Sequence, residues 1–297
     1  MVKLKQLLAA TDLSAPSRHA VDRGFRIAAT TGASYSVMHA IELDAIDALR
    51  ELIGDDTTAV KQKLENNVRK LLATSLADPT HNQGVTANAL IVSGAPLASI
   101  VANAAALEAD LLILGVRGED YLRHLLLGST ASRLLRKTIQ HPILMVKQPP
   151  YAPYRRLLIP VDFSPVSEKS IRLGRLVAPD ADIVLLHAFE VPFESKLRFA
   201  GVEDDVIARY RVAARNDVMK RMHHLARMAG LEVGDYMPLV LHGDPSQQAI
   251  EQEQERDCDL IVMGKHGTSV TEELLLGSVT QHVIAESQSD VLIAVDA

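Results

Sequence analysis

Residues 110–130 read DLLILGVRGEDYLRHLLLGST, and residues 259–279 read DLIVMGKHGTSVTEELLLGSV. Each segment begins with an aspartate and four apolar residues, followed by a glycine, two residues, a second glycine, nine residues and a third glycine. Every glycine of the second segment stands 149 residues after its counterpart in the first. An apolar run that ends in a glycine-rich turn before a helix favours a buried strand whose exit presents backbone N–H groups to an anion. The pattern therefore predicts two copies of a phosphate-binding α/β domain.

The duplication extends over almost the whole chain. LLAATDLS at residues 7–14 corresponds to LLIPVDFS at 157–164, and LLLGS occurs at both 125–129 and 274–278. A period of this length indicates a duplicated domain and not a solenoid. The proline-rich stretch 149–154 is predicted to be a short extended linker. We therefore expect a first domain at 1–148 and a second at 155–297.

Short apolar runs alternate with amphipathic stretches of helical period, which predicts a parallel sheet with helices on both faces. Strands of the first domain are expected near 6–11, 35–40, 86–92, 110–114 and 142–147, and those of the second near 156–161, 182–188, 236–242, 259–263 and 291–295. Helices of the first domain are expected to begin near Ala15, within 44–76, at Pro96 and at Ser129. Ligands of such sheets bind at the carboxyl ends of the strands. Groups that follow the first and fourth strands would meet in one crevice if those strands are neighbours.

Composition restricts the kind of protein. The chain has 297 residues, 47% of them hydrophobic and 23% charged, with a net charge of −6. The acidic balance argues against nucleic acid or an anionic membrane as a partner, because there is no excess of basic charge. No apolar run approaches membrane-spanning length, the N-terminus has no signal-peptide pattern, and the single cysteine, Cys258, fits a reducing compartment. We expect a cytosolic protein.

The motifs resemble those of the universal stress proteins, in a tandem form that covers residues 3–147 and 155–296. ATP-binding members of that family carry the same glycine spacing, followed by Ser or Thr. They also open with a strand that ends in a Pro-x-Asp-x-Ser turn, which residues 160–164 match and which Ala10 interrupts in the first domain. The resemblance implies two Rossmann-like domains of the adenine nucleotide alpha hydrolase type, each with strand order 3-2-1-4-5. It also implies that the two domains pair through their last strands, Ile143–Val146 and Val291–Val295, and a homodimer is a further possibility.

The same resemblance implies that ATP, accompanied by Mg²⁺, lies against the glycine loops. Glycines can adopt positive φ and let the backbone approach phosphate oxygens without a Cβ, and the following helix start adds N–H and hydroxyl donors. Candidate residues on the phosphate side are Gly115, Arg117, Gly118, Gly128, Ser129 and Thr130, and then Gly264, His266, Gly267, Gly277, Ser278 and Val279. Candidate residues on the adenine side are Thr11, Asp12 and Ala40, and then Val161, Asp162 and Ala188.

Several of these side chains have an alternative role. Asp12 and Asp162 can accept a hydrogen bond from the exocyclic amino group of adenine, or bond their own turn before the helix, and the two roles are compatible. Arg117 and His266 can contact phosphate or be solvated loop residues. Lys265 is expected to be exposed, His39 and His187 to make buried hydrogen bonds, and Cys258 to be unreactive between two aspartates.

The sequence thus predicts a cytosolic ATP-binding sensor or regulatory module, with nucleotide held in one or both domains. It contains no P-loop, dinucleotide fingerprint or nucleophile elbow. Two other classes stay open. One is a slow Mg²⁺-dependent ATPase that acts with another small ligand, and the other is an interaction scaffold that works without nucleotide.

Overall fold

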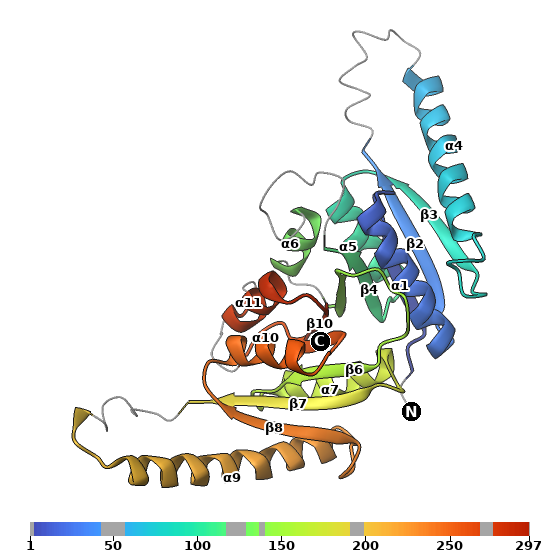
Figure 1. Ribbon diagram of the computed structural model, residues 1–297. Helices are drawn as coiled ribbons and strands as arrows, with labels where there is room; N and C mark the ends of the chain where they lie inside the picture. Colours follow the sequence, from blue (N-terminus) through green and yellow to red (C-terminus); the bar gives the residue numbers. More distant parts are fainter. Residues whose placement is uncertain are drawn as a thin grey trace. The chain divides into compact units, whose positions relative to one another are not determined.

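The computed structural model describes residues 3–42, 57–116, 129–136, 140–190, 199–267 and 276–296. The chain divides into two compact units, Met1–Pro153 and Tyr154–Asp296. Each unit contains five parallel strands in the expected order 3-2-1-4-5, namely β3-β2-β1-β4-β5 in the first and β8-β7-β6-β9-β10 in the second. Figure 1 shows β2 beside β3 in the first unit and β7 beside β8 in the second.

The elements of the first unit lie close to the positions that the apolar pattern predicts. They are β1 (Gln6–Ala10), α1 (Ala15–Thr31), β2 (Ser34–Ile41), α4 (Thr57–Leu76), β3 (Ala87–Ser93), α5 (Pro96–Ala106), β4 (Leu111–Gly115), α6 (Ser129–Arg136) and β5 (Ile143–Val146). Helix α1 begins after Ser14, whose hydroxyl accepts from the Ser17 N–H, and ends where Gly32 adopts a φ of 73°. Of the helix expected within 44–76, residues 44–56 lie outside the described residues.

The second unit repeats this order of elements. It contains β6 (Arg156–Pro160), α7 (Pro165–Val177), β7 (Asp182–Phe189), α9 (Asp204–Met228), β8 (Tyr236–His242), α10 (Pro245–Glu255), β9 (Leu260–Gly264), α11 (Ser278–Glu286) and β10 (Asp290–Ala294). Helix α7 contacts β6, β9, β10 and α9, whereas α10 contacts β6, β7 and α11. Right-handed crossovers account for this division of the helices between two faces of the sheet.

The central strands are buried on both faces, which explains their continuous apolar sequence. Leu157, Leu158 and Ile159 of β6 have no exposed surface, and neither do the first three residues of β9. Helix α7 approaches these strands closely at Gly174, where a Cβ would lie 3.2 Å from Leu157 Cδ1 and 3.4 Å from Val262 Cγ2. The C-terminal half of α7 is thereby held against β6 and β9.

The first and fourth strands are neighbours in each unit, because β1 pairs with β4 and β6 pairs with β9. The acid that precedes the fourth strand helps to set this pairing. Asp110 Oδ2 accepts from the backbone N–H groups of Lys5 and Gln6 at 2.6 and 2.9 Å. Asp259 accepts in the same way from Arg155 and Arg156 at 2.8 and 3.1 Å. These aspartates therefore accept hydrogen bonds from the backbone N–H groups at the start of the first strand, a role that the sequence pattern did not reveal.

Candidate functional site

The aspartate after the first strand organises the turn that leads into the first helix of each unit. In the second unit, Asp162 Oδ1 accepts from the Ser164 N–H at 3.0 Å, from Ser164 Oγ at 2.5 Å and from Ser167 Oγ at 2.9 Å. In the first unit, Asp12 Oδ1 accepts from the Ser14 N–H at 3.0 Å. Both aspartates thus make the Asx-turn that the sequence allowed. One carboxylate oxygen is used in this way, and the role on the adenine side stays a prediction.

The glycine loop after β9 lies directly against this aspartate. A Cβ built on Gly267 would lie 2.8 Å from Asp162 Oδ2, closer than side chains approach in folded proteins. A Cβ on Gly264 would overlap Cγ1 of Val166, in the first turn of α7. Glycine is therefore favoured at both positions because side chains approach the backbone closely. Neither residue has the positive φ that the sequence allowed for.

The N-terminus of α11 is anchored to the same loop. The Gly277 N–H donates to Lys265 O at 3.0 Å, and Thr280 Oγ1 donates to Gly264 O at 2.9 Å. Gly277 is the N-cap, and a Cβ there would lie 3.4 Å from Lys265 O. The first turn of a helix has N–H groups without intrahelical acceptors and carries partial positive charge. The backbone N–H groups of Ser278 and Val279, in this first turn, therefore offer a favourable site for an anion beside the glycine loop.

The positive φ angles of the site occur at bulky residues that the sequence analysis did not select. Leu13 has a φ of 67° and Phe163 a φ of 64°, each directly after the aspartate of its unit. Side chains with a Cβ rarely adopt this conformation, and it costs on the order of 1–3 kcal/mol. The same strained position in both copies marks this turn as one that the surrounding contacts hold in place.

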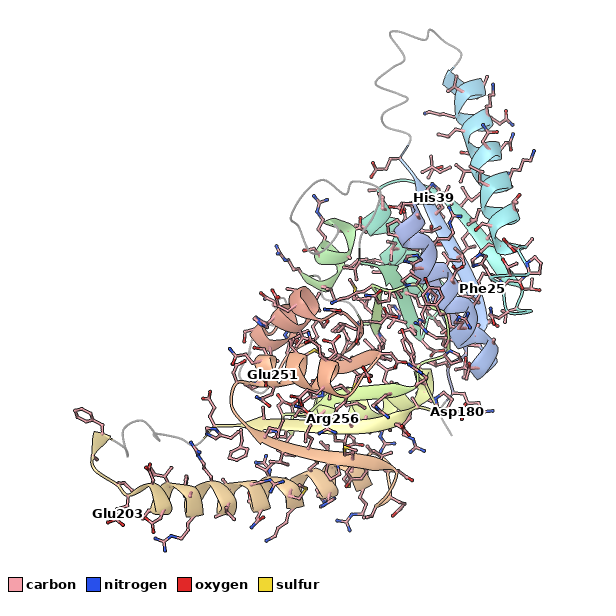
Figure 2. The ribbon with its side chains drawn as sticks, viewed as in Figure 1. Phe25, His39, Asp180, Glu203, Glu251 and Arg256 are labelled. Carbon is pink, nitrogen blue, oxygen red and sulfur yellow. The ribbon has the colours of Figure 1, made fainter. Side chains whose placement is uncertain are left out.

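In each unit, a histidine near the end of the second strand forms a hydrogen bond to the residue before the aspartate and so helps to fix the turn. His39 Nδ1 lies 2.9 Å from Thr11 O, and His187 Nδ1 lies 2.6 Å from Val161 O. Since a carbonyl oxygen only accepts, Nδ1 carries the hydrogen in both rings. Burial lowers the pKa of His187; the charge of Arg221 lowers it as well, whereas the hydrogen bond to Val161 and the nearby Asp162 oppose this. Figure 2 shows His39 near the end of β2.

Other candidate residues occupy more varied positions. Ala40 and Ala188 are half-buried and each is the second-to-last residue of its strand, β2 and β7 respectively. Thr130 is half-buried in the first turn of α6, which begins at Ser129. Arg117, Gly118 and Gly128 lie outside the described residues.

Lys265 is buried, with 6% of its surface exposed, so the prediction that it is exposed was wrong. Its N–H donates to Ala294 O at 2.9 Å, which continues the pairing of β9 with β10 beyond Gly264. Val116 makes the equivalent bond to Val146 O at 3.0 Å and is also buried. Lys265 and Val116 therefore extend the hydrogen bonding of the sheet and do not belong to the glycine loop. His266, the next residue, is half-buried.

Two absences hold for the described residues. These residues contain no cluster of three or more His, Cys, Asp or Glu side chains arranged to hold a metal ion. No helix among them is both long enough and apolar enough to cross a bilayer.

These features define a class of protein. Each unit is a doubly wound α/β sheet, and in the second an aspartate turn, a glycine loop and a helix N-terminus meet at the carboxyl edge of the central strands. A model of the universal stress protein family matches residues 3–147 and 153–294. The chain belongs to the universal stress protein family and carries two copies of its domain in tandem.

Individual relatives agree with this assignment. The chain is 27% identical over 157 residues to universal stress protein MJ0577 of Methanocaldococcus jannaschii, an alignment that spans 47% of this chain and 94% of that protein. It is 25% identical over 198 residues to universal stress protein Rv2005c of Mycobacterium tuberculosis, across 63% of this chain and 62% of that protein. The fold is also that of a universal stress protein from Archaeoglobus fulgidus, with a TM-score of 0.66, 19% identity and 98% of each chain covered.

Proposed function

We propose that this chain is a cytosolic regulatory module that binds ATP at the carboxyl edge of one or both sheets. The observation that carries the proposal is the approach of Gly267 to Asp162, in which a Cβ would come within 2.8 Å of the carboxylate. This approach supports the proposal because a carboxylate suited to the base and a loop suited to phosphates lie side by side.

The adenine side of the site is assigned to the aspartate turn. A carboxylate accepts hydrogen bonds, so it favours the 6-amino group of adenine over the carbonyl oxygen that guanine carries at that position. Asp162 is held by Ser164 and Ser167 through Oδ1, which orients the carboxylate before a ligand arrives. Val161, buried between the strand and the turn, and Ala188 offer the apolar surface beside it. Thr11, Asp12 and Ala40 take these roles in the first unit.

The phosphate side is assigned to the glycine loop and the start of α11. Gly267 is exposed and Gly277 is the N-cap, so backbone N–H groups of the loop and of the first helical turn can surround a phosphate. Ser278 is exposed and adds a hydroxyl donor. Mg²⁺ would then be held by phosphate oxygens and water, which is its usual coordination with nucleotides.

The proposal is tested by calorimetric titration of nucleotide-free protein with ATP, with and without Mg²⁺, and with GTP as the competing base. The decisive variant is Gly277→Asp. The backbone of Gly277, with φ −58° and ψ 147°, suits any residue, and Asp is a favoured N-cap. Its carboxylate would accept the N–H groups that a phosphate needs. We expect the variant to fold with an unchanged melting temperature and to lose more than tenfold in ATP affinity at that site.

Gly277→Ala is the matched control, because it adds the same Cβ without the charge. Gly128→Asp makes the equivalent change in the first unit. Binding of two ATP molecules, rejection of GTP and loss of one site in each Asp variant would support the proposal for both units. No binding of ATP by the intact chain would refute it and favour the nucleotide-independent scaffold. Phosphate release that disappears in the double Asp variant would identify the slow ATPase instead.

A further inference from the structure

An exposed arginine of the long helix α9 lies over the aspartate turn of the second unit. The guanidinium carbon of Arg221 is 4.1 Å from the ring centroid of Phe163. The ring of Phe163 also contacts that of His187, with centroids 4.6 Å apart and an angle of 38° between the planes. Phe163 directly follows Asp162 and has a φ of 64°. Arg221 and His187 thus hold a strained residue adjacent to the carboxylate.

Helix α9 is well placed to support this contact. Its buried residues include Val218, Met222 and Ala226, spaced four residues apart along one face. Arg221 stands beside Met222 at the border of that face, and α9 contacts α7. The cation is therefore presented by a helix that is itself anchored in the core.

Among the residues that the structure describes, the first unit has no such arrangement at this position. Val68, Leu72 and Leu76 of α4 repeat the buried spacing of α9, so Leu71 stands where Arg221 stands in the second unit. Leu71 is 62% exposed, and the residue after Asp12 is Leu13, which has no aromatic ring. The turns of the two units share their backbone conformation and the hydrogen bonds of their aspartate and histidine, but of the two residues that follow the aspartates only Phe163, and not Leu13, can make the ring contacts.

We propose that Arg221 is a positioning residue for nucleotide binding, which holds Phe163 and the Asp162 turn in the binding conformation and makes the second unit the tighter of the two sites. The inference rests on the proposed function, because it concerns the same site. A loop fixed before binding loses less conformational freedom when the ligand arrives, which raises affinity without a new contact to the ligand.

The expected effect follows from the strength of a partly exposed cation–π contact. Such a contact corresponds to about a three- to tenfold change in an equilibrium constant. ATP affinity is measured at the second site in a Gly128→Asp background and at the first site in a Gly277→Asp background. In these backgrounds the second site should bind ATP more tightly, and Arg221→Ala should weaken only that site by about three- to tenfold.

Matched variants separate this role from a general effect of charge or folding. Arg215→Ala removes another exposed cation of α9 and should leave the affinity unchanged. Phe163→Leu gives the second unit the residue of the first and should act like Arg221→Ala, whereas Arg221→Lys keeps a cation and should restore part of the affinity. The NMR titration of His187 should move to higher pH in Arg221→Ala, because Arg221 lowers the pKa of that ring.

The outcomes distinguish this inference from the proposed function. If the second site binds ATP with equal affinity in the parent and in Arg221→Ala, the inference is overturned and the proposed function stays intact. Equal losses in Arg221→Ala and Arg215→Ala would also overturn it, since a general charge effect would suffice. No ATP binding at either site would overturn both. A selective loss with partial recovery in Arg221→Lys would support the assignment.

Discussion

The close packing of Gly264 against α7 gives a quantitative prediction for Gly264→Ala. The added methyl group would overlap Val166 Cγ1 and lie 3.2 Å from Cγ2 and 3.1 Å from His266 O. Favourable carbon–carbon separations are about 3.5–4.0 Å, so either the helix or the loop must move. Val166 is buried and the loop is anchored through Thr280 and Gly277, so neither moves freely. Overpacking of this kind costs about 1–3 kcal/mol of unfolding free energy.

The experiment is a double-mutant cycle measured by thermal and urea unfolding. A loss of about 2 kcal/mol corresponds to a fall of roughly 4–8 °C in the melting temperature of a domain of this size. Val166→Ala alone removes two methyl equivalents and should cost about 1.5 kcal/mol. It also creates the space that Gly264→Ala needs, so the double variant should be more stable than additivity predicts by at least about 1 kcal/mol. The reasoning would be falsified if Gly264→Ala cost less than about 0.5 kcal/mol, or if the two changes were additive.

Three further predictions concern buried or half-buried ionisable groups of the second unit. Glu253 Oε1 accepts from the N–H groups of Gln288 and Ser289 at 2.9 and 2.5 Å. Urea unfolding should therefore show that Glu253→Ala lowers the unfolding free energy by about 2–4 kcal/mol, and that Glu253→Gln lowers it by less than half of that. Because burial lowers the pKa of His187, the unfolded state takes up a proton first as the pH falls below about 6.5. Stability should therefore decrease in that range, and a profile unaltered by His187→Gln would contradict this. Burial, with smaller effects of nearby charges, raises the pKa of the Cys258 thiol to about 12, so the folded chain should resist iodoacetamide at pH 8 and react fully only in denaturant.

The sequence reveals the fold of this protein because the fold depends on periodic, local signals. Apolar runs of five residues such as Leu111–Gly115 predict buried strands, and Ser14 and Ser164 mark helix starts wherever the tertiary structure places them. The spacing of the glycines marks positions where other groups approach the backbone closely, and its recurrence after 149 residues shows the duplication. The alternation of strands and helices predicts a parallel sheet covered on both faces, whereas the strand order 3-2-1-4-5 was expected from the resemblance to the universal stress proteins.

Contacts between distant segments could not be obtained in this way. Gly267 and Asp162 are more than a hundred residues apart, and only the pairing of β6 with β9 brings them together. The burial of Lys265 follows from its hydrogen bond to Ala294, which no property of lysine indicates. The same holds for Arg221, one exposed cation among many in the sequence until the path of α9 places it over Phe163. Sequence thus determined the elements and the residue types available to the site, whereas the tertiary structure decided which side chains meet, because packing across the sheet joins residues without regard to their separation along the chain.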